Sequence, residues 1–152
     1  MQVQQTSLIG VPVVQEGAKR DWNILISDVD VGLHVRTRLE MKDVVIHGRK
    51  LNFLHAFSRK ETIERLRESA DIDLIFLDVD YDPYDTGLRN NRLLSECAGG
   101  SAIPVVLLSS AKERVSLTED VPFDTTVRAT IDKQHASYKT FVDTLTALLP
   151  EN

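Results

Sequence analysis

The chain has 152 residues, a formal net charge of -5 and 42% hydrophobic residues. This length is typical of one domain, and the hydrophobic content is sufficient for an ordinary core. No block of lysine and arginine stands out, which argues against a nucleic-acid-binding surface, and no apolar run approaches the roughly 20 residues that span a bilayer. The single cysteine, Cys97, excludes an internal disulfide. Together with an N-terminus that lacks the pattern of a signal peptide, it indicates a cytoplasmic protein.

Residues 1–21 show no hydrophobic period, and we expect a poorly ordered tail there, followed by a domain over residues 22–150. Short apolar segments bounded by polar residues are typical of strands, and of strands buried on both faces where the run is continuous. Such strands are predicted at residues 23–27, 51–57, 73–77, 103–108 and 126–131. Gly48-Arg49 is predicted to be a turn, and the apolar patch Val44-Val45-Ile46 fits no element clearly.

Helices are predicted between the strands, beginning near Val31, Arg59, Leu88, Ala111 and Tyr138. The second and fourth follow capping boxes, Ser58-Arg59-Lys60-Glu61 and Ser110-Ala111-Lys112-Glu113, which mark helix starts. The first helix has three core-facing candidates, Leu33, Leu39 and Met41. The last helix has the clearest amphipathic period, with one face made by Tyr138, Phe141, Val142, Leu145, Leu148 and Leu149.

Five strands that alternate with about five helices predict an α/β fold with a parallel sheet covered on both faces. At this size the natural choice is a flavodoxin-like, doubly wound sheet with the strand order 2-1-3-4-5. In such a sheet, ligands bind beyond the carboxyl ends of the strands. Polar residues at those ends are therefore the first candidates for a functional site.

Four strand ends carry such residues. Asp28 and Asp30 follow the first strand, Asp78 the third, Ser109 the fourth and Lys133 the fifth. A carboxylate can accept a phosphoryl group, and neighbouring carboxylates can bind Mg²⁺, which prefers oxygen ligands. A hydroxyl and an ammonium can then contact the remaining phosphoryl oxygens. Each residue alone has a plainer explanation, such as a helix cap or a solvated lysine, and only the combination predicts a site.

We expect the metal ligands to come from Asp28, Asp30 and Asp78, with a backbone carbonyl near Asp80 as a further ligand. The four histidines are scattered and show no metal-ligand spacing, so they are interpreted as surface or packing residues.

The ordered set of strand-end motifs resembles the receiver domains of two-component response regulators. The motifs are Ile24-Leu25-Ile26-Ser27-Asp28, Leu77-Asp78, Pro104-Val105-Val106-Leu107-Leu108-Ser109 and Thr130-Ile131-Asp132-Lys133. The resemblance implies a bacterial signalling protein that is not an enzyme. It assigns Asp78 as the phosphoacceptor, Ser109 and Lys133 as contacts of the phosphoryl group, and Asp28 as the first member of the acidic pair.

The resemblance also implies partners. A histidine kinase or phosphotransfer protein would supply the phosphoryl group, a downstream effector would read the result, and a homodimer is a further possibility. Three segments, Leu33-His34 with Thr37-Arg38-Leu39, Gly48-Arg49-Lys50-Leu51 and Phe53-Leu54-His55-Ala56-Phe57-Ser58, resemble receivers that precede HD-type cyclic-di-GMP phosphodiesterase domains. Neither a nucleic acid nor a membrane is an expected partner of this domain.

The sequence departs from the receiver pattern at three positions. Val29 occupies the second acidic position, so Mg²⁺ binding is in question; Thr130 replaces the usual aromatic switch residue, and Gln134 replaces the proline after the lysine. One alternative is therefore a degenerate receiver that binds partners without phosphorylation. A remote alternative is a haloacid-dehalogenase-type phosphohydrolase, whose nucleophile motif resembles Asp28-Val29-Asp30.

Overall fold

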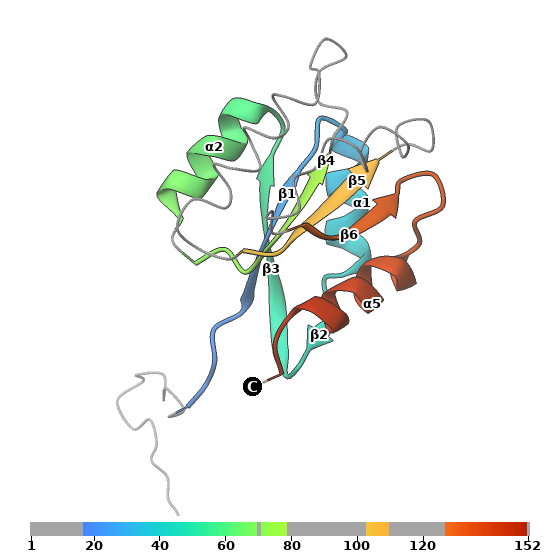
Figure 1. Ribbon diagram of the computed structural model, residues 1–152. Coiled ribbons are helices and arrows are strands. Elements are labelled where there is room, and N and C mark those ends of the chain that lie inside the picture. The colour runs from blue at the N-terminus through green and yellow to red at the C-terminus, as the bar shows by residue number, and fades with distance from the viewer. Residues whose placement is uncertain (1–16, 70, 79–102, 110–126, 152) are drawn as a thin grey trace, which may run out of the picture.

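The computed structural model describes residues 17–69, 71–78, 103–109 and 127–151. It contains a six-stranded sheet with the order β2-β3-β1-β4-β5-β6 (Figure 1). The strands are β1 (Trp22–Ser27), β2 (Val45–Ile46), β3 (Arg49–Ala56), β4 (Leu74–Asp78), β5 (Val105–Ser109) and β6 (Val127–Asp132). All neighbours pair in parallel except β2 and β3. The five parallel strands have the predicted order, and the flavodoxin-like fold is confirmed.

Strand β2 is an addition to the predicted five-stranded sheet. It pairs antiparallel with the start of β3, through Val45 with Lys50 and Ile46 with Arg49. His47 and Gly48 form the connection, with φ of 49° and 79°, and a two-residue hairpin with both φ values positive matches the twist of its strands. The predicted turn at Gly48-Arg49 was therefore one residue late, and β3 starts at Arg49 rather than at Leu51.

Three helices are described: α1 (Val31–Glu40), α2 (Arg59–Glu68) and α5 (Tyr138–Leu148). Ser58 caps α2 by accepting from the amide of Glu61, as predicted. The Glu61 carboxylate, however, accepts from the amide of Phe57 (2.6 Å), one residue before the cap. Each of these helices is too short or too polar to span a bilayer. The helices predicted near Leu88 and Ala111 lie outside the described residues.

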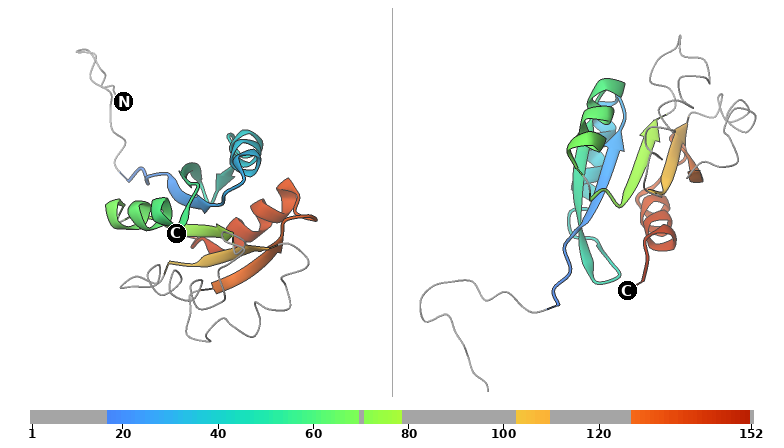
Figure 2. Two further views of the ribbon diagram at one scale, coloured as in Figure 1. Left: turned by 90° about the horizontal axis from the view of Figure 1, so that it is seen from above. Right: turned by 60° about the vertical axis from the view of Figure 1, so that its left-hand side comes forward.

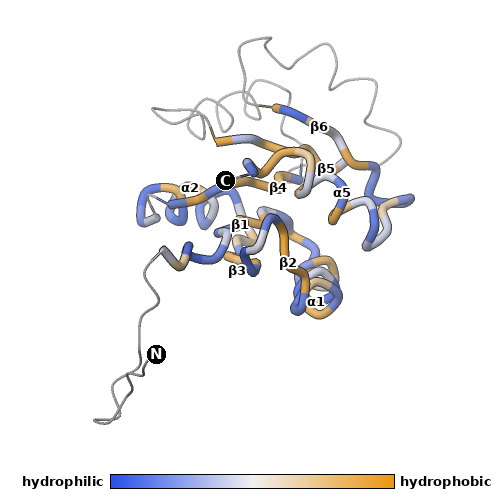
Figure 3. Tube along the Cα trace, turned by 90° about the horizontal axis from the view of Figure 1, so that it is seen from below, coloured by the Kyte–Doolittle hydropathy of each residue, from blue (hydrophilic) through white to orange (hydrophobic). Residues whose placement is uncertain are grey.

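Alternating side chains of the central strands build two cores, one on each face of the sheet. Ile24, Leu74 and Val106 belong to the core on the side of α1 and α5. The next residue of each strand, Leu25, Ile75 and Leu107, belongs to the core on the side of α2. Figures 1 and 2 show α2 on one side of the sheet, with α1 and α5 on the other. In Figure 3 the apolar colour follows β4 and β5 and also appears on α1.

Two residues predicted to face the core are exposed. Leu39 in α1 is 58% exposed and Tyr138 at the start of α5 is 46% exposed, whereas Leu33, Met41, Phe141 and Leu145 are buried. Leu39 lies on the outer face of α1 because Leu33, His34 and Thr37 make its buried face. Tyr138 is the first residue of α5.

This difference gives a stability test. Replacing Leu145 by Ala should lower the free energy of unfolding by about 2–5 kcal/mol, because it leaves a cavity in a fully buried position. The matched change Leu39→Ala removes the same atoms from an exposed position and should cost less than about 0.5 kcal/mol. Urea denaturation measures both values, and equal losses would contradict the assigned burial.

Candidate functional site

The parallel strands bring four predicted site residues to one edge of the sheet. Asp28 directly follows β1, Asp78 ends β4, Ser109 ends β5 and Lys133 directly follows β6. Asp78 pairs with Leu108, the neighbour of Ser109, and Ser109 pairs with Asp132, the neighbour of Lys133. We call Asp28, Asp78, Ser109 and Lys133 the strand-end cluster.

Lys133 connects the two carboxylates of the cluster. Its Nζ lies 2.9 Å from Oδ2 of Asp28 and 3.4 Å from Oδ2 of Asp78. Both aspartates are almost completely buried, at 0% and 1% exposed, whereas the lysine side chain keeps 21% of its surface. Burial alone would lower the pKa of Lys133, but its interactions with Asp28 and Asp78 outweigh burial and raise this pKa. The ammonium therefore remains charged at neutral pH.

Backbone hydrogen bonds fix the loops that carry these side chains. The amide of Lys133 donates to the carbonyl of Ser109 (2.8 Å), which ties the turn after β6 to the end of β5. The amide of Asp28 donates to the carbonyl of Ala56 (3.0 Å) at the end of β3. The turn at Lys133 is closed by Asp132, whose Oδ1 accepts from the amide of Gln134 (2.9 Å). The turn therefore forms without the proline that receivers usually have at this position.

The hydroxyl of Ser109 is fully buried, and its Oγ has no hydrogen-bond partner among the described residues. Buried hydroxyls in native proteins are nearly always hydrogen-bonded, so such a group needs an explanation. A ligand oxygen at the strand-end edge would be a suitable partner for this hydroxyl, which has none in the described part of the chain.

Asp30 has a different environment from Asp28 and Asp78. It is exposed, and its Oδ1 accepts from the amide of Gly32 (2.9 Å), which caps the N-terminus of α1. Its own amide donates to Oδ1 of Asp28 (2.8 Å). Val29, between them, is 58% exposed. Asp80 lies outside the described residues.

The described part of the chain therefore offers a metal ion two buried carboxylates, and it contains no group of three or more acidic, histidine or cysteine side chains suited to a metal. Mg²⁺ is often held by one or two carboxylates, with water and substrate oxygens completing its shell. The donor set fits that kind of site. Lys133 already supplies one positive charge between the same carboxylates.

Sequence reasoning missed a pair of histidines, of which one, His34, contacts the cluster. Nε2 of His34, on α1, lies 2.7 Å from the backbone oxygen of Asp28, and Nδ1 of His34 lies 2.7 Å from Nδ1 of His55, on β3. The sequence holds no spacing that would reveal this contact, because the two residues come from different elements and neither is a metal ligand here.

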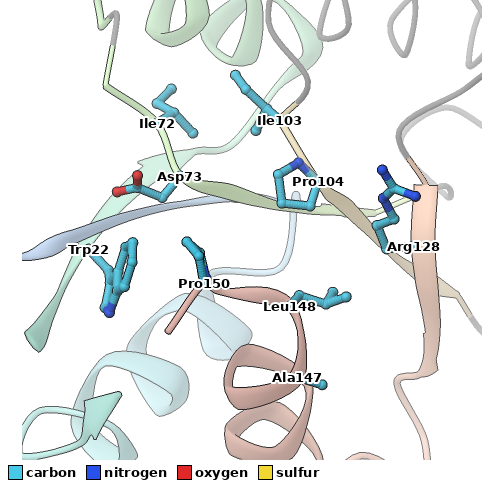
Figure 4. A pocket seen from close by; sticks show the side chains of 9 residues that line it. All are labelled: Trp22, Ile72, Asp73, Ile103, Pro104, Arg128, Ala147, Leu148 and Pro150. Carbon is cyan, nitrogen blue, oxygen red and sulfur yellow. The ribbon is translucent and has the colours of Figure 1, made fainter. Parts of the chain in front are cut away.

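A pocket of about 490 Å³ opens at the opposite edge of the sheet, where the strands begin (Figure 4). It is lined by Trp22, Ile72, Asp73, Ile103, Pro104, Arg128, Ala147, Leu148 and Pro150. Asp73 pairs with Arg20 at 2.6 Å, and its Oδ2 also accepts from the amide of Asn23 (2.8 Å). The Asp73 carboxylate therefore holds the segment before β1 against the sheet. The pocket shares no residue with the strand-end cluster.

Several solved structures with the same fold are receiver domains. A response regulator receiver domain protein from Clostridium thermocellum matches with a TM-score of 0.61 and 14% identity, over 84% of this chain and 93% of that one. The signal receiver domain of an HD domain-containing protein from Pseudomonas fluorescens Pf-5 matches with a TM-score of 0.65 and 15% identity, over 85% and 94%.

A third match is a chain from the complex of the CheA3 P1 domain with CheY6 from R. sphaeroides, with a TM-score of 0.63 and 15% identity over 86% and 98%. Neither the protein-family models nor the curated proteins gave a significant match to the sequence. The chain thus has the fold of response-regulator receiver domains.

Removing the ammonium tests its role in the cluster. Lys133→Ala should lower the free energy of unfolding by about 1–3 kcal/mol at neutral pH, because two buried carboxylates lose their counter-charge. Pairing raises the pKa of Lys133, so its contribution is complete at neutral pH and is lost only as the pH rises through that raised value.

The control is Lys139→Ala, which removes an 80% exposed partner of Asp143 on the surface of α5 and should cost under about 0.5 kcal/mol. Urea denaturation with both variants gives the comparison. A loss for Lys133→Ala as small as that of the control would show that the described ion pairs do not form in solution.

Proposed function

We propose that this chain is a receiver domain that accepts a phosphoryl group on Asp78 from a histidine kinase or phosphotransfer protein. The observation that carries the proposal is the buried carboxylate of Asp78 at the carboxyl edge of the sheet, with the Lys133 ammonium 3.4 Å away. The receiver fold supports it, and so does the buried Ser109 hydroxyl, which has no hydrogen-bond partner among the described residues.

In the proposed reaction, a carboxylate oxygen of Asp78 attacks the phosphorus of a phosphohistidine. The phosphorus–nitrogen bond breaks, its electron pair stays on the imidazole, and Asp78 becomes an acyl phosphate. The Lys133 ammonium neutralises charge that develops on the phosphoryl oxygens, and the Ser109 hydroxyl donates to one of them. The product carries about -1.5 to -2 charge at neutral pH, and we propose that the turn after β6 and the end of β5 respond to it.

Mg²⁺ is part of the proposal. When bound, it would neutralise the incoming phosphoryl oxygens, and Asp28 and Asp78 are the residues that would hold it. Asp30 is less suited because its carboxylate caps α1. Val29 provides no acidic ligand, so we expect this affinity to be weaker than in a receiver with two adjacent acidic residues.

A second candidate is a receiver that binds partners without phosphorylation. Two observations favour it: Val29 replaces an acidic residue, and the Lys133 ammonium already bridges the carboxylates that a metal would bind. The phosphohydrolase alternative requires Asp30 as a general acid. Because its carboxylate is engaged at the start of α1, and because the fold neighbours are receivers, we do not propose that reaction.

We propose that the phosphodonor protein docks on α1. Val31, Val35 and Leu39 are 60%, 48% and 58% exposed, and their spacing of four residues places them in one apolar stripe along this helix. The stripe begins three residues after Asp28, at the same edge as the cluster. The CheA3 P1–CheY6 complex among the fold neighbours supports a partner of this class.

For the output, we propose a downstream effector that reads the phosphorylated state. One fold neighbour comes from an HD domain-containing protein, and the segments from Leu33 to Ser58 resemble receivers of that kind. An HD-type phosphodiesterase domain is therefore the effector class that we propose.

Phosphorylation is tested with acetyl phosphate and Mg²⁺. We expect intact-protein mass spectrometry to show a gain of one phosphoryl group, which is lost in Asp78→Asn and kept in Asp43→Asn, the same change at an exposed aspartate. If wild-type protein gains no mass from acetyl phosphate or from any autophosphorylated kinase, the phosphorylation-independent candidate is correct instead. A gain that persists in Asp78→Asn would place the acceptor elsewhere.

The docking surface is tested by comparing two phosphodonors. Val35→Lys should slow phosphotransfer from an autophosphorylated histidine kinase at least about 10-fold, as expected for losing more than 1.4 kcal/mol of association. The rate with acetyl phosphate should not change. Val45→Lys is the control, because Val45 is similarly exposed (55%) but lies on β2, at the other end of the sheet. Equal slowing by both variants would exclude α1 as the specific docking site.

A further inference from the structure

His34 and His55 form a hydrogen-bonded pair between α1 and β3. His34 is only 2% exposed and His55 is half-buried. The ring of His34 also lies against Phe57, with 4.1 Å between the ring centroids, and Phe57 is 37% exposed. The pair therefore connects the backbone of Asp28 to the partly exposed His55 near the end of β3.

The partners of His34 determine where its proton sits. A backbone carbonyl can only accept, so the 2.7 Å contact with the Asp28 oxygen requires a hydrogen on Nε2 of His34. In the neutral ring, Nδ1 is then an acceptor, and the 2.7 Å contact with His55 requires a hydrogen on Nδ1 of His55. The Asp28 carbonyl thus fixes the tautomer of His34, and the tautomers of His34 and His55 depend on each other.

The environment of His55 favours the neutral form of its ring. Burial lowers the pKa of His55, and the neighbouring His34, Arg38 and Arg65 lower it further. The two Nδ1 atoms lie 2.7 Å apart, which is a hydrogen-bond distance and is shorter than the roughly 3.3 Å between two nitrogens on one tetrahedral Zn²⁺.

The Asp28 residue is held at three other points. Its amide donates to the carbonyl of Ala56 (3.0 Å), its Oδ1 accepts from the amide of Asp30 (2.8 Å) and its Oδ2 pairs with Lys133. The His34 bond is the described contact that fixes the Asp28 carbonyl. Because the Asp28 carbonyl carbon is bonded to the Cα that carries the side chain, a carbonyl without this bond would allow the carboxylate to shift away from Lys133.

We propose that His34 is a positioning residue for Asp28, and that His55 keeps His34 in the tautomer this requires. Two hydrogen bonds, from His55 to His34 and from His34 to the Asp28 carbonyl, couple the end of β3 to the strand-end cluster. A substitution or a contact that removes the Nδ1 donor at His55 therefore disturbs Asp28 without touching it. The consequence for phosphorylation rests on the proposed function, whereas the positioning itself does not.

The first test is the imidazole ¹⁵N spectrum of the wild-type protein at neutral pH. The proposal expects His34 to be protonated at Nε2 and His55 at Nδ1. The opposite tautomer at His34 would overturn it, and this result needs no variant and no phosphorylation.

The second test uses matched variants that keep or remove each donor. His34→Gln keeps an N–H near the Nε2 position and His34→Met does not; His55→Asn keeps one near Nδ1 and His55→Leu does not. The readout is the NMR signals of the Asp28 carboxyl and the Lys133 ammonium. Gln and Asn should retain wild-type signals, whereas Met and Leu should shift both. Wild-type signals in folded Met and Leu variants would overturn the proposal, as would shifted signals in all four.

The third test follows the rate of acetyl phosphate transfer to Asp78. Outer-shell partners of a metal site typically affect affinity or activity 10–100-fold, so the Met and Leu variants should lose about 10-fold in rate and the Gln and Asn variants should recover it. If the wild-type protein is not phosphorylated, the proposed function fails. The two NMR tests then still decide whether His34 positions Asp28.

Discussion

The structure depends on one ammonium group between two buried carboxylates. Asp28 and Asp78 are at most 1% exposed, and two such charges cannot share a site without a counter-charge. Lys133 provides that charge because the turn after β6 is tied to the end of β5. Parallel pairing of β1, β4, β5 and β6 determines that these residues meet at one edge. The site is thus a direct consequence of the sheet topology.

The same interaction explains how the site could change state. A phosphoryl group on Asp78 would compete with both carboxylates for the Lys133 ammonium and would give the buried Ser109 hydroxyl a partner. Under the proposed function, elements around the cluster would transmit such a change. Helix α1 begins beside Asp28 and exposes an apolar stripe, while His34 connects its buried face to the Asp28 carbonyl.

Sequence reasoning predicted the elements that depend on local pattern. Continuous apolar runs located β1, β4 and β5, and the serine at position 58 located the start of α2. The short strand β2 was not predicted, because two residues carry too little pattern to distinguish a strand. Leu39 was misplaced because helical spacing allows several faces, and packing of Leu33 and Thr37 selects one of them. For the cluster, strand-end positions predicted convergence, whereas the lysine bridge and the histidine pair depend on side-chain contacts between distant elements.

The most direct test of this account is an NMR titration of the lysine ammonium groups. Lys133 should titrate above the ordinary lysine value of 10.5, because Asp28 and Asp78 together raise its pKa despite burial. Asp28→Asn should lower the pKa of Lys133 relative to the wild-type protein. If Lys133 titrates at or below the ordinary lysine value in the wild-type protein, the ammonium does not bridge the carboxylates and the proposed site loses its basis.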